Sequence, residues 1–477
     1  GEYKDVFGNV NVYGTNPLKT PMLRISPFKF PIGVHVLEHI DRLVEIFNVC
    51  WPMYAAMPAV LKEAMLKSYE DCGWDLDSSE NKYSNCLFPN FTDLLNNLVI
   101  VINDSAYSEE LKSNYQGALV TRVKSLNSGL YKRIFSDDEL GDEALFDNNV
   151  IVDLSRVGAQ ETKALIMGVL IMRLGEYRAN SNIKHNSDLR HITILEEAHN
   201  ILKRTSQEQT MEGSNIAGKS VEMLSNAIAE MRTYGEGFII VDQSPGAVDI
   251  SAIRNTNTKI IMRLPEDSDR KVAGKASGMK EEQVDEIAKL PTGVAVVYQN
   301  DWEEPVLCKI GKYEEEEIPF SFTPDTSLEK EANNTRIEIL KLLLKGRIIS
   351  PIEIDIDAIE VGLSKVNLST FCKSFIYRAI KEFKEGEEVS LWKDDNFVPL
   401  SRIVTEVIAA KSEVERLVNK AVNFEELTNE LYDFVYNKMK GLPNELSLVI
   451  SQCLMRDYSL ANDEKKRIYS AWYQSVK

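Results

Sequence analysis

The sequence predicts an α/β fold with a mainly parallel sheet, an inserted helical bundle and a mostly helical C-terminal domain. Between residues 146 and 324, short runs rich in Val, Ile and Leu alternate with amphipathic stretches of helical spacing. Strands that alternate with helices form parallel βαβ units. The apolar runs are continuous, as is typical of parallel strands that are buried on both faces. Together, these observations favour one α/β core.

Shifts in composition and periodicity divide the chain into four parts. The first belongs to the core, the second is a helical insertion, the third holds most of the core, and the fourth is a separate helical domain. These parts are residues 1–33, 34–145, 146–324 and 325–477. Ile40, Leu43, Phe47 and Trp51 show the helical spacing of the insertion. A polar link after Pro324 introduces the last part.

The elements of the core follow one another in a regular order. The expected strands are Val150–Leu154, Ile192–Leu195, Phe238–Val241, Lys259–Leu264 and Val294–Tyr298. Helices are expected over Ala159–Arg178 and from Val221 onward. In α/β proteins, ligand groups gather where parallel strands end. Residues that directly follow these strands are therefore candidates for a functional site.

Composition narrows the class of protein. The 477 residues carry a net charge of −18, which argues against coating nucleic acid with the whole surface but is compatible with DNA in a narrow basic channel. The six cysteines include no Cys-x-x-Cys pair, which favours free thiols in a reducing cytoplasm. No secretory signal is visible, and no apolar run approaches the ~20 residues of a membrane helix. We therefore expect a cytoplasmic protein without a membrane partner.

An acid pair carries the strongest chemical signal. Glu196 and Glu197 follow the strand Ile192–Leu195, and Gln243 follows the strand Phe238–Val241. In P-loop ATPases, acids at such a strand end hold magnesium and activate water, and a later polar residue faces the γ-phosphate. An apolar tetrapeptide before two acids is common by chance. The ordered series of strands and polar residues therefore supports an ATPase site better than the pair alone.

Two arginines are candidates for a finger that reaches the nucleotide of a neighbouring subunit. Arg232 lies in the turn before the strand Phe238–Val241, and Arg263 follows the apolar run Ile260–Met262. A solvated or ion-paired surface role is at least as common for an arginine in such a position.

The phosphate-binding loop is the other half of such a site. Residues Gly213–Ser220 match G-x-x-x-x-G-K-[ST] letter for letter. A functional loop follows a strand and opens a helix, whereas the residues before this match are polar and the match comes after the acid pair. We interpret it as a surface loop before a helix. The phosphate loop of the intact protein is expected ahead of Gly1.

A second motif, His35-Val-Leu-Glu-His39, matches the H-x-x-E-H pattern of inverted zinc peptidases. On a helix both histidines share one face, as zinc ligands require. The pattern is short, and with 73 acidic residues a third ligand can always be found. A helix surface with ordinary hydrogen-bonded histidines is the favoured interpretation.

Several segments resemble the HerA/FtsK group of hexameric P-loop ATPases, and HerA-type proteins in particular. They are ITILEEAHNIL, EMRTYGEGFIIVDQSP, IRNTNTKIIMRLP and LPTGVAVV, with FDNNVIVDLSRVG and the opening GEYKDVFGN upstream. The resemblance covers residues 1 to about 310 and is specific as an ordered set. It implies a RecA-like core assembled into a ring around DNA, and it assigns no motif to residues 325–477.

The same resemblance implies roles for single residues. Glu196 and Glu197 become the Walker B acids, with Glu196 holding Mg²⁺ through water. Gln243 becomes the sensor, and Arg232 becomes the arginine that reaches across a subunit interface. ATP and Mg²⁺ are the implied cofactors.

We therefore expect a subunit of a ring-shaped, ATP-driven translocase or helicase that acts on double-stranded DNA as a homo-oligomer, in the simplest case a hexamer. The resemblance also implies pairing with a nuclease or an antiphage defence effector. The alternative is a catalytically silent ring or scaffold protein that binds partner proteins. ATP hydrolysis is expected of the intact protein, and the sequence leaves it open for this chain alone.

Overall fold

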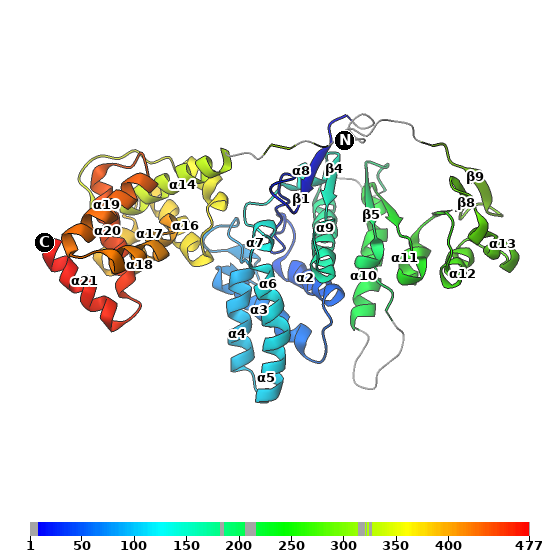
Figure 1. The fold of residues 1–477 in the computed structure, drawn as a ribbon, viewed down its shortest axis with the longest axis horizontal. Helices are drawn as coiled ribbons and strands as arrows, with labels where there is room; N and C mark the ends of the chain where they lie inside the picture. Colours follow the sequence, from blue (N-terminus) through cyan, green and yellow to red (C-terminus); the bar gives the residue numbers. More distant parts are fainter. Residues whose placement is uncertain are drawn as a thin grey trace. The chain divides into compact units, whose positions relative to one another are not determined.

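The structure is a computed structural model that describes residues 8–181, 186–205, 216–312, 320, 322–323 and 327–476. The chain forms two compact units (Figure 1). The first comprises Gly1–Lys67, Leu94–Phe135 and Glu139–Pro324, and the second comprises Ser68–Asp93, Ser136–Asp138 and Asp325–Lys477. The first unit mixes strands with helices and the second is almost entirely helical, which confirms the predicted α/β class.

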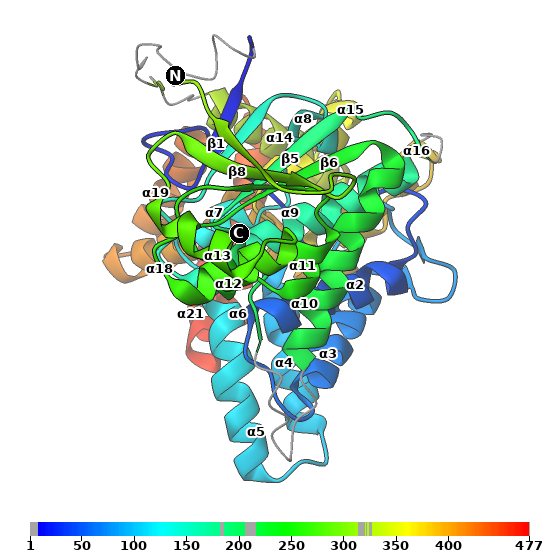
Figure 2. The ribbon, with the colours of Figure 1, turned by 90° about the vertical axis from the view of Figure 1, so that its right-hand side faces the viewer.

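Two pairs of parallel strands lie in the first unit. β1 (Asn11–Gly14) pairs with β4 (Val150–Asp153), and β5 (His191–Glu196) pairs with β6 (Glu236–Val241). Figure 2 shows β5 and β6 side by side. Helix α10 (Ile216–Glu230) follows β5 and returns the chain to the start of β6, as a parallel connection requires. The predicted parallel pairing of β5 and β6 is confirmed.

The third sheet of this unit is antiparallel, and here the prediction of parallel pairing is wrong. β8 (Val294–Gln299) lies between β7 (Thr258–Ile261) and β9 (Val306–Lys309) and runs antiparallel to both. Two helices, α12 (Asp267–Ala276) and α13 (Glu281–Glu286), separate β7 from β8 in place of one crossover helix. The extra helix adds a reversal of chain direction, so β8 begins at the end of the sheet where β7 stops.

Helices α2 (Val36–Cys50) and α9 (Gln160–Asn180) pack against each other, and α10 packs against α2 (Figure 1). Gly168 of α9 permits the close approach, because a Cβ atom there would lie 2.6 Å from Cγ2 of Ile46. The helix expected over Ala159–Arg178 is therefore present with nearly the predicted bounds.

Shorter helices complete the region before β4 and the segment after β6. They are α3 (Met57–Asp71), α4 (Phe91–Asp104), α5 (Glu109–Tyr115), α6 (Thr121–Leu126), α7 (Tyr131–Ile134), α8 (Asp142–Phe146) and α11 (Ile250–Asn255). A π-helical turn, Gln116–Val120, joins α5 to α6. A small antiparallel pair, β2 (Trp74–Asp75) and β3 (Glu80–Asn81), also occurs here and was not indicated by the sequence.

One face of the β5–β6 pair is apolar and exposed. The register places Ile194 opposite Ile239, with Ile192 and Val241 on the same face. The exposed fractions are 46% for Ile192, 59% for Ile194, 47% for Ile239 and 43% for Val241. Leu195 points to the opposite face and is buried. The expectation that these strands are buried on both faces is therefore wrong for the part of the chain that the structure describes.

A buried ion network holds the amino-terminal ends of β5 and β6. Glu236 accepts hydrogen bonds from Nε of Arg178 at 3.1 Å and from Oγ1 of Thr193 at 2.7 Å, and it faces Nδ1 of His191 at 2.6 Å. Arg178 also donates to Asp147. Burial raises the pKa of Glu236, but the hydrogen bonds from His191 and Thr193 outweigh it and hold the pKa below its usual value.

The second unit is a bundle of helices around a large apolar core. They are α14 (Ser327–Leu344), α15 (Ile356–Gly362), α16 (Thr370–Lys384), α17 (Phe397–Ile408), α18 (Lys411–Lys420), α19 (Phe424–Lys438), α20 (Asn444–Ser459) and α21 (Asp463–Val476). The apolar stripe that the sequence shows at Ile403, Val404, Val407 and Ile408 is fully buried in α17. Among the residues that the structure describes, no helix has the length and apolar character needed to cross a membrane.

Polar contacts tie two short segments from earlier in the chain to α16, within the second unit. The hydroxyl of Thr370 donates to the Asp93 carboxylate, and Lys373 forms an ion pair with Asp137. Burial is the main cause that raises the pKa of Asp93 to about 6, against the hydrogen bond from Thr370. Residues 68–93 and 136–138 thus pack with the C-terminal helices.

Candidate functional site

Glu197 and Gln243 meet at the carboxyl ends of β5 and β6. Glu196, the last residue of β5, lies opposite Val241, the last residue of β6. Just beyond the strands, Nε2 of Gln243 donates a hydrogen bond to Oε1 of Glu197 at 2.9 Å. The structure thus brings together two predicted site residues that lie 46 positions apart in the sequence.

Glu197 has a left-handed backbone conformation, with φ 52° and ψ 50°. Such a conformation costs a residue other than glycine on the order of 1–3 kcal/mol, and it persists where the surroundings hold it. Here Asn200 donates two hydrogen bonds to the Glu197 carbonyl, from its main-chain N–H at 2.9 Å and from Nδ2 at 2.8 Å. The turn ends the alternation of β5, so Glu197 faces Gln243 while Glu196 stays on the exposed face of the strand pair.

Two further side chains complete this cluster, and the sequence analysis did not single them out. Nδ1 of His199 lies 2.8 Å from Oδ2 of Asp242 and 3.7 Å from Oε2 of Glu197. His199 belongs to a 3-10 turn, Ala198–Asn200, and Asp242 precedes Gln243. The sequence could have indicated both residues, because His199 and Asp242 are polar and lie within two positions of the predicted site residues Glu197 and Gln243.

The chemistry of Glu196 suits a magnesium ligand. Its carboxylate is exposed and makes no hydrogen bond or ion pair within the part of the chain that the structure describes. Proteins bind Mg²⁺ through one or two carboxylates, with water and phosphate oxygens in the other positions. No group of three or more His, Cys, Asp or Glu among the described residues could hold a metal ion by itself. A single carboxylate leaves the other positions around Mg²⁺ to water and phosphate oxygens.

The two candidate arginines do not join the acid pair within one chain. Arg232 lies in a 3-10 turn before β6, whereas Gln243 follows β6, so about 20 Å of extended strand separates them. Arg263 follows β7, and its Nε donates to the carbonyl of Ala288 at 3.1 Å. Both side chains are exposed on the surface of the chain.

The match to the phosphate-loop pattern lies mostly inside a helix. Residues 218–220 are part of the first turns of α10, while Gly213–Asn215 lie outside the described residues. Ser220 is buried, and its hydroxyl donates to the carboxylate of Glu45 in α2. In a phosphate loop this hydroxyl would contact magnesium. The contact with Glu45 supports a structural role for Ser220, in a helix that begins five residues before the predicted start.

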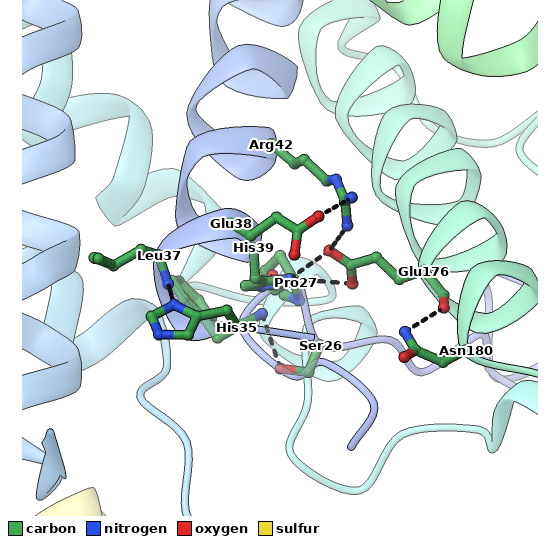
Figure 3. Close-up of polar contacts among 10 residues, drawn as sticks. Ser26, Pro27, His35, Leu37, Glu38, His39, Arg42, Glu176 and Asn180 are labelled. Atoms are coloured by element: carbon green, nitrogen blue, oxygen red, sulfur yellow. Dashed lines mark hydrogen bonds and ion pairs between the residues drawn. The ribbon is translucent and has the colours of Figure 1, made fainter. Parts of the chain in front are cut away.

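The residues of the H-x-x-E-H motif form hydrogen bonds within the protein, and His39 is the buried member (Figure 3). Nδ1 of His35 accepts from the main-chain N–H of Leu37 and caps α2. His39 is buried, with Nδ1 3.0 Å from Glu176 and Nε2 3.0 Å from the carbonyl of Pro27. Both nitrogens of the His39 ring are engaged, so neither offers a lone pair to a metal. The interpretation of hydrogen-bonded histidines is confirmed, whereas the expected position on a helix surface is wrong for His39, which is fully buried.

Comparison with known proteins finds relatives of the HerA type. The DNA double-strand break repair helicase HerA of Sulfolobus acidocaldarius is 30% identical to this chain over 167 residues, which make up 34% of this chain and 32% of the relative. The protein of the same name from Sulfurisphaera tokodaii is 25% identical over 232 residues, or 47% of this chain and 45% of the relative. These relatives confirm the predicted resemblance to HerA/FtsK-type P-loop ATPases. No family model matches the sequence.

The chain spans less than half the length of either HerA relative. Among solved structures, VirB4 of Thermoanaerobacter pseudethanolicus has a TM-score of 0.46 at 16% identity, covering 65% of this chain and 79% of VirB4. The plasmid coupling protein TrwB in complex with ADP and Mg²⁺ has a TM-score of 0.42 at 11% identity, covering 65% of this chain and 75% of TrwB.

Proposed function

We propose that this chain is a subunit of a ring-shaped, ATP-driven DNA translocase or helicase of the HerA type, built on a RecA-like core. The observation that carries the proposal is the hydrogen bond from Gln243 to Glu197, which joins the ends of two adjacent parallel strands. A carboxylate and an amide in this position are the groups that such ATPases place around the γ-phosphate and the attacking water. The HerA relatives are named DNA repair helicases, which supports DNA as the substrate.

The proposal assigns a role to each of the three polar residues at the strand ends. Glu196 holds Mg²⁺ through water, and the bound metal neutralises phosphate charge. Glu197 accepts a proton from the attacking water, and Gln243 orients that carboxylate and senses the γ-phosphate. This division fits the structure, because the Glu196 carboxylate is exposed and Glu197 is already held by Gln243.

A ring of identical subunits, in the simplest case a hexamer, would supply groups that one chain does not bring to its own site. Arg232 and Arg263 are exposed and lie apart from the acid pair of their own chain, which suits a role at the nucleotide of a neighbour. The exposed apolar face of the β5–β6 pair supports contact with a further polypeptide. The phosphate loop is proposed to lie on a segment of the intact protein outside the described residues.

The proposed ring holds double-stranded DNA in a basic channel, which reconciles DNA binding with a net charge of −18. A nuclease or an antiphage defence effector is the proposed partner. The support for this partner is the family resemblance alone.

The decisive experiment replaces Glu197 by Gln in the intact protein. The variant should bind ATP as the wild type does, while ATP turnover falls about 100-fold or more because an amide does not accept the proton of the attacking water. Glu222→Gln, at an exposed position of α10, is the matched control and should leave turnover unchanged. Unaltered turnover in Glu197→Gln would contradict the proposal.

A catalytically silent ring or scaffold is the second candidate. It is favoured by the contact of Ser220 with Glu45, which commits the pattern-matching serine to the packing of α10 on α2. Equilibrium binding of ATP to the intact protein separates the two candidates. A stable oligomer that binds no ATP would support the scaffold.

A further inference from the structure

Asp242 holds His199 at two points beside the candidate site. The Asp242 side chain is only 5% exposed. Its Oδ2 accepts from the main-chain N–H of His199 at 2.8 Å and also lies 2.8 Å from the ring Nδ1. Its Oδ1 accepts from the main-chain N–H of Ser244 at 2.9 Å. One carboxylate therefore fixes both the main chain and the ring of His199.

These contacts determine the tautomer of His199. A carboxylate oxygen accepts hydrogen bonds, so the Nδ1 atom that faces it must carry a hydrogen. In the neutral ring, Nε2 then holds the lone pair. This Nδ1–H form follows from the hydrogen-bond partners and gives the side of the ring that faces the acids a partial positive charge.

The two carboxylate oxygens of Glu197 have different neighbours. Oε1 accepts from Gln243 at 2.9 Å, and Oε2 lies 3.7 Å from Nδ1 of His199. The Oε2–Nδ1 distance is too long for a hydrogen bond but short enough for electrostatic attraction. Gln243 and His199 thus limit the rotation of the carboxylate from its two sides, and Oε2 accepts no hydrogen bond from the described residues.

We propose that His199 is a positioning residue for Glu197 and that Asp242 sets its tautomer and orientation. The proposal rests on the proposed role of Glu197 in ATP hydrolysis. The Nδ1 hydrogen of His199 is committed to Asp242, so His199 acts on the direction of the Glu197 carboxylate and takes no proton from the attacking water through this atom. The pairing of His199 with Asp242 is not evident from the sequence, because the two residues lie 43 positions apart.

The first test measures steady-state ATP hydrolysis by the intact protein. His199→Ala and Asp242→Asn should each lower kcat by about 10- to 100-fold, since small misplacements of a reacting group have effects of this size. The KM for ATP should change by less than about twofold, because neither side chain is proposed to contact the nucleotide. His199→Asn keeps an N–H donor near the position of Nδ1 and should restore part of the lost kcat. Equal activity of the Ala and Asn variants, or a change in KM alone, would overturn the proposal.

The second test needs no turnover. The chain has five histidines, so ring ¹⁵N spectra of the labelled protein contain few signals, and His199→Asn identifies the signal of His199. In mildly alkaline buffer this signal should show the Nδ1–H tautomer, and Asp242→Asn should remove that preference. An Nε2–H tautomer in the wild type would refute the structural part of the proposal. If the tautomer is found but the intact wild type hydrolyses no ATP, the proposed function fails and the His199–Asp242 pairing stands.

Discussion

His39 and Glu176 form a buried pair between α2 and α9. The His39 side chain is completely buried and that of Glu176 is 1% exposed, with Arg42 as a second partner of Glu176 (Figure 3). Replacing one member of such a pair leaves the other buried without its partner, which costs more than the pair contributes when intact. A residue that matches the zinc-peptidase pattern therefore forms a buried packing contact in this chain.

His39→Ala should destabilise the first unit by about 3–5 kcal/mol, because the Glu176 carboxylate would keep its burial and lose its main partner. His35→Ala is the matched control, and the loss of its helix cap should cost about 0.5–2 kcal/mol. Urea unfolding followed by circular dichroism measures both values. A similar small cost for the two variants, together with zinc lost from the His39 variant, would instead point to a metal site.

Lys219 provides a direct test of the phosphate-loop match. It lies in the first turns of α10, next to the Ser220–Glu45 contact. Lys219→Ala should leave the affinity of the intact protein for ATP within about twofold of the wild type, whereas loss of a phosphate-loop lysine removes a charge that pairs with the phosphates. Isothermal titration with a non-hydrolysable ATP analogue measures the effect. A collapse in affinity would identify residues 213–220 as the phosphate loop.

At the scale of elements, the contact between Asp93 and Thr370 of α16, both in the second unit, predicts a pH dependence. Burial raises the pKa of Asp93 from 3.8 to about 6, so between these values the folded chain binds a proton that the unfolded chain has released. The free energy of unfolding therefore falls as pH rises through this window, by on the order of 3 kcal/mol.

Asp93→Asn should flatten this slope, because the amide does not ionise and its oxygen can still accept from Thr370. Urea unfolding at a series of pH values between about 4 and 7 gives the slope for each protein. Asp104→Asn, at the exposed last residue of α4, is the control and should behave like the wild type. Parallel slopes for the Asp93 variant and the wild type would contradict the assignment.

The sequence predicted helices better than strand partners. α9 and the buried stripe of α17 were visible because helical spacing is a local pattern. The antiparallel partner of β7 was not visible, because it depends on how α12 and α13 turn the chain between the strands. The two-residue strands β2 and β3 are too short to leave a period in the sequence.

The candidate site was predictable in part for similar reasons. Polar residues after parallel strands share one edge of a sheet, so the meeting of Glu197 with Gln243 could be expected. The pairing of His199 with Asp242 depends on the left-handed turn at Glu197, and glutamate has no local preference that signals such a turn. The catalytic roles of all these residues stay predictions.

At the scale of the whole molecule, the exposed face of the β5–β6 pair should govern solution behaviour. The chain alone should bind a hydrophobic dye and self-associate at that face. Changing Ile194 to Lys together with Ile239 to Glu places opposite charges across the strand register and should lower both signals. Val422→Lys, at another exposed apolar residue, is the control. Dye fluorescence and light scattering measure the effect, and weak dye binding by the wild type would contradict it.

The left-handed backbone conformation at Glu197 lowers the stability of the chain, whereas the proposed ATP hydrolysis needs the Glu197 carboxylate. Glycine adopts this conformation at little cost, and asparagine tolerates it better than glutamate does. Selection for heat resistance alone would therefore favour Gly or Asn at position 197 and would discard the carboxylate in the process. A homologue with Gly or Asn at this position is expected to form a more stable ring that no longer hydrolyses ATP.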